Sequence, residues 1–304
     1  MARWQLCSVV LLLAAGPATA LADEGKTGSV FGLTTHGYVD RWELDQASQR
    51  GTFVIRPYKP LYILPVSWTD DPNEQPVSEG GGNELPEPLV LQNWEAEFQI
   101  SFKTKIWQGV FKRYGDLWVA YTQTSRWQVY NDEASRPFRE SNYEPEAILS
   151  FATDFPFLGF RGRLLGVSLN HQSNGRAEPL SRSWNRVIGM AGFERGTWVV
   201  QVRPWWRIHD SAEGDENPEI EDYMGRLEVL VVRRWKGHEI DLTARHSLRL
   251  DERSHGSLQI DWAFPISGEL KGHLRIFTGY GESLIDYNHR QTTVGLGVSL
   301  LQWL

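Results

Sequence analysis

Hydrophobic and polar residues alternate along several stretches of this 304-residue chain. Between residues 94 and 106 the even-numbered positions are mostly apolar, with Trp94, Phe98 and Ile100 among them, and the odd-numbered positions are charged or polar. The same alternation recurs in segments 238–250 and 257–281. Because successive side chains of a β-strand point to opposite faces, a period of two predicts strands with one apolar and one polar face. These strands are too long and too regularly amphipathic for a soluble β-sandwich.

The pattern predicts about twelve such strands. They fall near residues 58–68, 94–108, 115–130, 143–154, 160–174, 182–193, 197–209, 223–236, 238–250, 257–267, 270–281 and 287–303. An even number places both chain ends on the periplasmic side, with short turns there and longer loops outside. We therefore expect an all-β protein, a single transmembrane antiparallel β-barrel. Its apolar positions would face lipid, and its charged positions would form a packed network of ion pairs in the lumen.

The beginning of the chain differs from the alternating part. Arg3 precedes an apolar run at residues 6–15, and small residues follow at positions 18–22, which is the form of a secretory signal peptide. The run is too short to cross a membrane as a helix. Residues 1–22 are therefore interpreted as a signal peptide and residues 23–57 as an N-terminal periplasmic segment. Residues 58–304 form the barrel domain in this interpretation.

Composition supports an exported barrel. The 14 tryptophans accompany a mean hydropathy of only -0.40, as expected when the apolar surface is spread over every second residue. A formal net charge of -7 argues against a nucleic-acid partner. The single cysteine, Cys7, lies in the predicted signal peptide, so we expect no disulfide and no thiol chemistry in the mature chain.

Three polar residues near one predicted turn have the side chains of a serine hydrolase site. His171 and Ser173 are two residues apart in a strand, so they point to the same face. Asn174-Gly175 is a turn signal that would bring Asn185 on the next strand beside His171. This arrangement would supply a nucleophile, a base and an orienting amide. The same residue types are ordinary at a hairpin tip, and H-x-S-x-G is less diagnostic than G-x-S-x-G.

The face on which these residues lie favours a catalytic role. His171 and Ser173 continue the apolar row that contains Leu165 and Leu169, and Asn185 continues the apolar row of the following strand. Polar side chains on a lipid-facing row are costly, so we expect them to have a function there. By strand count, this rim of the barrel is the extracellular one.

Gln123 is another polar residue on a predicted lipid-facing row. An amide without a partner leaves unsatisfied hydrogen-bonding groups in hydrocarbon. A contact with a second subunit would satisfy it, and the alternative is a snorkelling or water-coupled glutamine. We therefore expect Gln123 at a dimer interface.

Four segments resemble a known family. They are S-R-P-F-R-E-S-N-Y-E-P at residues 135–145, the stretch from Asn170 to Arg186, N-P with Y-M-G between residues 217 and 225, and G-Y-G-E-S-L-I-D-Y-N at residues 279–288. With these motifs the chain resembles outer membrane phospholipase A of Gram-negative bacteria. The likeness covers nearly all of the chain from about residue 58.

The resemblance implies a twelve-stranded outer-membrane barrel that hydrolyses acyl esters of glycerophospholipids at the first or second position. It also implies activity on lysophospholipids, a requirement for Ca2+, and a homodimer as the active form. Carried over by motif, Ser173 is the nucleophile, His171 the general base, Asn185 the residue that orients it, and Gln123 the interfacial glutamine. The active site is expected on the side of the extracellular leaflet, where membrane phospholipids reach it.

The same resemblance assigns metal ligands. Arg176 and Ser181 match calcium-site positions of one subunit, and Ser135 matches the position contributed by the other subunit. A second calcium position of the family, an acid just before Asn-Pro, corresponds to Glu216, in a loop that looks longer here.

Two other classes of protein remain open at the level of sequence. A passive transport barrel or porin would have the same strands, with the His171 motif as an ordinary turn, and would conduct ions in a planar bilayer. A structural or adhesive barrel would show no esterase activity. The remaining histidines, including His209, are expected to have no catalytic role.

Overall fold

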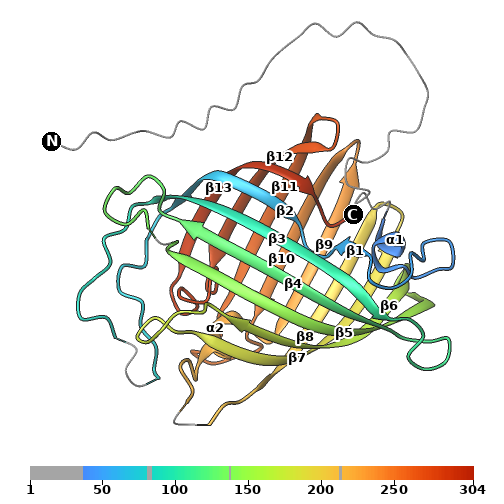
Figure 1. Ribbon diagram of the computed structural model, residues 1–304, viewed down its shortest axis with the longest axis horizontal. Coiled ribbons are helices and arrows are strands. Elements are labelled where there is room, and N and C mark those ends of the chain that lie inside the picture. Colours follow the sequence, from blue (N-terminus) through green and yellow to red (C-terminus); the bar gives the residue numbers. More distant parts are fainter. Residues whose placement is uncertain (1–36, 81–83, 137, 212–213) are drawn as a thin grey trace, which may run out of the picture. The chain divides into compact units, whose positions relative to one another are not determined.

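Twelve antiparallel strands close into a barrel in the computed structural model, which describes residues 37–80, 84–136, 138–211 and 214–304 (Figure 1). The predicted signal peptide lies outside these residues. The strands are β2 (Leu61–Thr69), β3 (Trp94–Trp107), β4 (Asp116–Trp127), β5 (Glu140–Phe157), β6 (Phe160–Ser173), β7 (Ser183–Arg195), β8 (Trp198–Ile208), β9 (Leu227–Trp235), β10 (His238–His246), β11 (Gly256–Ser267), β12 (Leu270–Gly279) and β13 (Gln291–Leu301). Each strand pairs with the next one along the chain, and β13 pairs with β2. The predicted all-β barrel is confirmed.

The two faces of the strands have the predicted character. On β3, Glu97 and Lys103 are 1% and 0% exposed, whereas Ile100 and Phe102 are 44% and 40% exposed. Buried charges are paired inside the barrel, for example at 3.2 Å between Arg126 Nη2 and a Glu97 carboxylate oxygen. The charged positions therefore fill the lumen, and the apolar positions form the outer surface.

Some strand ends differ from the prediction. Strand β9 begins at Leu227 rather than near 223, because Ile220–Met224 forms the short helix α2. The last strand begins at Gln291 rather than near 287, because residues 280–290 fold as a loop. Ile220 and Met224 are buried, so this five-residue helix is stabilised by packing against the rest of the protein. It is too short to show an amphipathic pattern in the sequence. Within the described residues, no helix is long and apolar enough to cross a bilayer.

The connections are short at one end of the barrel and long at the other. At the first end, the turns after β5, β7, β9 and β11 are residues 158–159, 196–197, 236–237 and 268–269, and the connection after β3 is longer, residues 108–115. The long loops at the opposite end are residues 70–93, 128–139, 174–182, 209–226, 247–255 and 280–290. His171, Ser173 and Asn185 lie at the end with the long loops.

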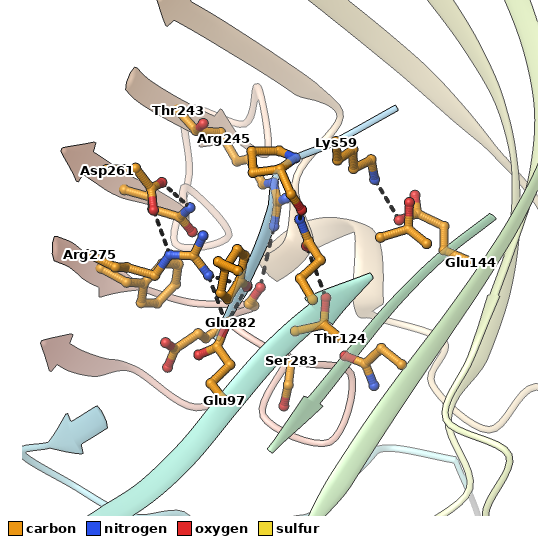
Figure 2. Close-up of a pocket in the computed structure, with 18 of the residues that line it drawn as sticks. Lys59, Glu97, Thr124, Glu144, Thr243, Arg245, Asp261, Arg275, Glu282 and Ser283 are labelled. Carbon is orange, nitrogen blue, oxygen red and sulfur yellow. Dashed lines mark hydrogen bonds and ion pairs between the residues drawn. The ribbon is translucent and has the colours of Figure 1, made fainter. Parts of the chain in front are cut away.

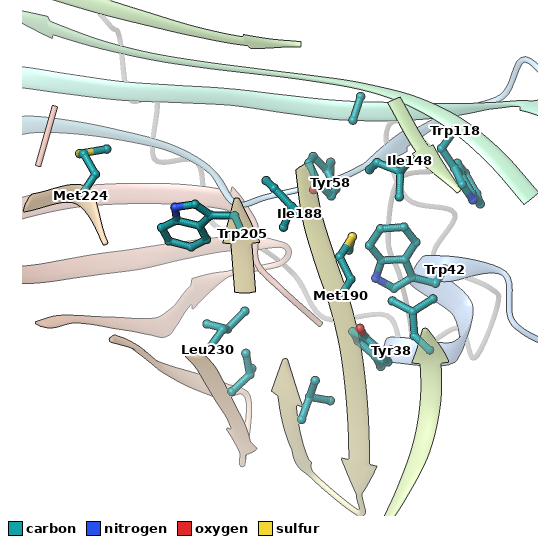
Figure 3. Packing of buried hydrophobic residues seen from close by; sticks show 14 of the residues in the cluster. Tyr38, Trp42, Tyr58, Trp118, Ile148, Ile188, Met190, Trp205, Met224 and Leu230 are labelled. Atoms are coloured by element: carbon teal, nitrogen blue, oxygen red, sulfur yellow. The ribbon is translucent and has the colours of Figure 1, made fainter. Parts of the chain in front are cut away.

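The described part of the N-terminal segment packs against residues that line the lumen (Figure 3). It contains helix α1 (Tyr38–Trp42) and strand β1 (Ile55–Pro57), which pairs with β3. The Trp42 ring lies 6.0 Å from the ring of Tyr58 and 6.2 Å from that of Trp118, measured between centroids. The Lys103 Nζ atom is 3.0 Å from the Trp42 ring centroid, so the indole contacts a buried amino group as well as apolar neighbours.

Trp42→Ala is expected to lower the free energy of unfolding by about 3–5 kcal/mol, because a large buried ring is removed and Lys103 loses its aromatic partner. Unfolding in detergent, followed by loss of β-structure in circular dichroism, measures this. Phe53→Ala is the control, since Phe53 lies in the same segment and is 75% exposed. Equal destabilisation by the two variants would contradict a structural role for the Trp42 contact.

Candidate active site

The strand register brings His171 and Asn185 together. His171 lies on the outward-facing row of β6, near the end of the strand, and is the direct partner of Asn185 on β7. The His171 Nδ1 atom lies 2.8 Å from Asn185 Oδ1. Because an amide oxygen only accepts, Nδ1 carries the hydrogen in this contact and Nε2 is left as the basic nitrogen.

Ser173 follows on the same outward-facing row as His171. Leu165 and Leu169 of this row are 41% and 59% exposed, so the row belongs to the outer surface of the barrel. The hydroxyl oxygen of Ser173 accepts a hydrogen bond of 3.1 Å from the backbone N–H of Gly175. In the described residues no hydrogen bond joins Ser173 to His171, a contact that often tightens only when substrate binds.

The turn after Ser173 is held by one buried amide. Asn174 donates from Nδ2 to the carbonyl oxygen of Leu180 at 2.8 Å, and its Oδ1 accepts from the backbone N–H of Arg182 at 3.0 Å. Gly175 has a positive φ of 63°, and a Cβ atom there would lie 3.1 Å from the ring of Tyr143. The positive φ therefore favours a glycine, and a side chain at this position would also press against the Tyr143 ring.

A cluster of hydrogen-bonded side chains joins β6 to β7 on the lumen side of this site. Arg186 donates to the Asn170 side-chain oxygen at 2.6 Å and to the Gln172 side-chain oxygen at 3.3 Å. Trp184 Nε1 also donates to Gln172, at 2.9 Å. These residues were not identified from the sequence. The only indication of their role in the sequence was that Asn170, Gln172 and Arg186 are polar and occupy the positions that face the lumen. They fix the register that places Asn185 opposite His171.

The residues implied in metal binding lie in two neighbouring loops. Arg176 and Ser181 belong to the loop after β6, and Ser135 belongs to the loop after β4. The Arg176 guanidinium donates to the carbonyl oxygen of Arg139 at 2.8 Å, and Trp127 Nε1 donates to the carbonyl oxygen of Ser135, also at 2.8 Å. Among the described residues, no hydrogen bond joins Ser135 to Arg176 or Ser181.

The donor chemistry at these positions suits calcium. Within the described residues there is no group of three or more His, Cys, Asp or Glu side chains placed to hold a metal. Calcium instead takes hydroxyl and carbonyl oxygens. In the described contacts, the hydroxyls of Ser135 and Ser181 have no hydrogen-bond partner, although the backbone oxygens of both residues do. Their hydroxyl oxygens are therefore available as ligands.

Glu216 lies beside the row that contains Ser173. Its carboxylate accepts from the Ser183 hydroxyl at 3.4 Å, and Ser183 is the direct strand partner of Ser173. The backbone oxygen of Glu216 accepts from the Ser78 hydroxyl at 2.5 Å, which joins this loop to the one after β2.

Gln123 has hydrogen-bond partners within the chain, which corrects the expectation of an unpartnered amide. Its side-chain oxygen accepts from the Tyr121 hydroxyl at 3.0 Å, and its Nε2 atom donates to the Ser125 hydroxyl at 3.1 Å. Residues two apart on a strand share a face, so Tyr121 and Ser125 reach Gln123 along the outer surface. Gln123 is also the strand partner of Tyr143, which is in turn the partner of Ser173.

The lumen behind the site encloses a small polar cavity of about 120 Å³ (Figure 2). Its lining carries paired charges, such as Lys59 with Glu144 at 2.6 Å and Arg275 with Glu97 at 2.8 Å. A cavity of this size between ion-paired walls is not the wide conduit of a porin.

Comparison with known proteins agrees with this fold. The model of the family described as phospholipase A1 matches residues 39–300. The phospholipase A1 of Klebsiella pneumoniae is 37% identical over 248 residues, which cover 82% of each chain. An outer membrane phospholipase A structure from Escherichia coli, an active-site mutant with an asparagine changed to alanine, has a TM-score of 0.74 and 33% identity, covering 84% of this chain and 95% of its own.

A second solved structure is similar over most of the chain. It is the Salmonella typhi outer membrane phospholipase, described as a dimer with bound calcium, with a TM-score of 0.75 and 33% identity. It covers 88% of this chain and 99% of its own. The fold and these likenesses define an outer-membrane β-barrel enzyme. Within that class, the chain belongs to the phospholipase A1 family, the outer membrane phospholipases A.

Proposed function

We propose that this phospholipase A1 is a calcium-dependent serine hydrolase that cleaves acyl esters at both positions of glycerophospholipids and also accepts lysophospholipids. The observation that carries the proposal is the His171 to Asn185 hydrogen bond on the outer surface, beside Ser173. A catalytic serine needs a base on the same face and a third group that fixes the tautomer of that base. This arrangement has all three groups.

The reaction follows from these atoms. Ser173 Oγ attacks the carbonyl carbon of the acyl ester while His171 Nε2 takes the hydroxyl proton. The ester C–O bond then breaks, and Nε2 returns the proton to the departing alcohol oxygen of the lysolipid. Water, deprotonated by the same nitrogen, then attacks the carbonyl carbon of the acyl-serine. The bond between this carbon and Ser173 Oγ breaks, Nε2 returns the proton to Oγ, and the fatty acid leaves. The Gly175 N–H, 3.1 Å from Ser173 Oγ, is a donor within reach of the oxyanion that forms at the carbonyl.

Asn185 accepts the hydrogen bond from His171 but carries no negative charge. It therefore supports the imidazolium less than an aspartate would, and transition-state stabilisation must come from elsewhere. Arg176 and Ser181 would hold calcium together with the partner subunit's Ser135, and Glu216 would take part in a second position used by the monomer. Bound calcium would polarise the ester carbonyl and stabilise the oxyanion.

The site is proposed to open toward the extracellular leaflet, because the long loops of outer-membrane barrels lie on that side. Ser173 and His171 extend a row of exposed apolar side chains, so a phospholipid could react without leaving the membrane. A homodimer formed through the surface around Gln123 would bring the second subunit beside this row. Because Gln123 is bonded to Tyr121 and Ser125 within the chain, a pairing of two Gln123 amides would exchange those bonds.

Hydrolysis of mixed detergent–phospholipid micelles tests the proposal. Substrates with different acyl chains at the two positions report the products of each cleavage, and a lysophospholipid reports the third activity. We expect release of both fatty acids, and loss of release when a chelator removes calcium. Release of only the chain at the first position would contradict the second-position activity.

Asn185→Ala is expected to lower turnover by about ten- to a thousandfold without eliminating it, because the orientation of His171 is lost while nucleophile and base remain. Removal of a charged orienting group has cost about ten-thousandfold elsewhere, and a neutral amide has less to lose. Initial rates on mixed micelles measure this, with Asn93→Ala, an exposed loop amide, as the control. If Asn185→Ala were as inactive as Ser173→Ala, an orienting role alone would be wrong.

A further inference from the structure

The loop between β12 and β13, residues 280–290, is buried although it is an irregular segment. It contains most of the G-Y-G-E-S-L-I-D-Y-N motif, for which the proposed mechanism has no role. Leu284, Ile285 and Asp286 are each no more than 1% exposed. Irregular loops normally run over a surface. This one, here termed the mouth loop, lies beside α2 at the end of the barrel that carries the long loops, where a Cβ atom at Gly281 would touch Met224 (Figure 1).

One carboxylate connects the mouth loop to the turn after Ser173. Glu140, at the start of β5 and 2% exposed, accepts from the backbone N–H of Ile285 at 3.2 Å through Oε1. The same oxygen accepts from Asn142 Nδ2 at 2.6 Å, and Asn142 in turn accepts from the backbone N–H of Leu284 at 3.0 Å. The other oxygen, Oε2, accepts from Asn174 Nδ2 at 3.4 Å.

Asn174 connects Glu140 to the loop that contains Arg176 and Ser181. Its Oδ1 accepts from the backbone N–H groups of Arg176 and Arg182, at 3.3 and 3.0 Å. These bonds hold both ends of the loop that contains Arg176 and Ser181. The position of that loop is therefore set by a side chain that Glu140 holds from the other side.

A second connection runs through Asp286 and Arg139. Asp286 accepts from Arg139 Nη1 at 3.0 Å, from the Ser283 hydroxyl at 2.6 Å and from Asn73 Nδ2 at 3.2 Å. The carbonyl oxygen of Arg139 accepts from the Arg176 guanidinium at 2.8 Å. Burial acts to raise the pKa of the Asp286 carboxyl, but Arg139 and Ser283 hold this pKa below its ordinary value. Asp286 is therefore held as an anion against Arg139.

We propose that Glu140 and Asp286 are positioning residues, which hold the loop with Arg176 and Ser181 in the geometry that binds calcium. The inference rests on the proposed function, because the proposed function assigns calcium to the loop with Arg176 and Ser181. A metal site needs its ligands held within about 0.5 Å of the productive geometry, and side chains on rigid elements provide this better than a free loop. The buried mouth loop is the fixed element. Glu140 connects it to Asn174, and Arg139 connects it to Arg176.

Glu140→Gln tests the first connection. Both oxygens of Glu140 accept hydrogen bonds from N–H groups, so the NH2 of glutamine must face one of these donors. Asp286→Asn tests the second connection and leaves Arg139 paired with Glu95, at 2.8 Å. Glu228→Gln is the matched control, because Glu228 is a buried carboxylate paired with Arg203 and Arg245 in the lumen.

Three measurements on the full chain in detergent decide the proposal. Calcium binding by calorimetry and the calcium concentration for half-maximal hydrolysis should both weaken at least about tenfold, which is about 1.4 kcal/mol. Saturating calcium should restore at least about half of the wild-type turnover. Amide hydrogen exchange of residues 174–182, measured without calcium, should speed up in Glu140→Gln and Asp286→Asn but not in Glu228→Gln.

The outcomes separate this proposal from the proposed function. Unchanged calcium affinity and unchanged exchange in folded variants overturn the positioning role, as does an equal effect in Glu228→Gln. Folding is checked by the mobility shift between unheated and heated samples in electrophoresis, and if Glu140→Gln does not fold, Asp286→Asn decides alone. A wild-type protein that binds no calcium overturns both proposals, whereas calcium binding with unchanged variants overturns only this one.

Discussion

Ser173→Ala is expected to remove phospholipase activity, with a loss of at least about ten-thousandfold in turnover, while the barrel still folds. Losses of this size follow removal of a nucleophile in other serine hydrolases. His171→Ala should lose a similar factor, because the serine hydroxyl is then left without a base. Fatty-acid release from mixed micelles measures both losses, and circular dichroism confirms the β-structure.

Two matched variants control for this prediction. Ser168→Ala changes a serine of the same strand that faces the lumen, is 2% exposed and has no hydrogen-bond partner in the described residues. His209→Ala changes an exposed loop histidine. Both should keep near-native turnover. Near-native turnover by Ser173→Ala itself would remove Ser173 from the mechanism.

Activity is expected to require calcium and a homodimer together. Ser135 lies in a different loop from Arg176 and Ser181, and within one chain the described hydrogen bonds do not join it to them. The partner subunit's Ser135 would complete the site across the interface. Calcium and substrate would then bind mainly the dimer, so each should shift the monomer–dimer equilibrium toward it.

Sedimentation in detergent measures this linkage, with calcium and a serine-reactive sulfonyl inhibitor as the substrate mimic. We expect the dimer fraction to rise with each addition and to fall when a chelator is added. Ser135→Ala should raise the calcium concentration needed for both dimerisation and activity, and Ser168→Ala should leave both unchanged. A calcium-free monomer with full activity would contradict the prediction.

The sequence by itself determined the barrel and the faces of its strands. A period of two is a local property, so each alternating segment reports a strand and the direction of every side chain without knowledge of its partners. The parity of Leu165, Leu169 and His171 was sufficient to place the histidine on the outer surface. The Asn174-Gly175 turn signal predicted that the chain doubles back and brings the next strand beside this one. The loop of residues 174–182, which sets Ser173 opposite Ser183 and Asn185 opposite His171, is known only from the structure.

The tertiary structure decided which hydrogen-bond and ion-pair partners the polar side chains have. Gln123 appeared unpartnered because the parity gives the face of a residue but not the side-chain conformations that bring Tyr121 and Ser125 to its amide. The pairing of the lumen charges is of the same kind. Glu97 pairs with Arg126, its partner on the neighbouring strand β4, and also with Arg275 on β12, and only the closed barrel brings β12 near β3.

The buried segments outside the strands also needed the folded chain. Helix α1 and the mouth loop have no extended period, since their apolar and polar residues meet different parts of the lumen. Trp42 contacts Tyr58 and Trp118, and Ile285 bonds to Glu140, which lies 145 positions away along the chain. Contacts over such separations arise only after the barrel closes. The sequence thus determined the wall of the barrel and the face on which His171 and Ser173 lie, and the closed barrel determined what supports them from inside.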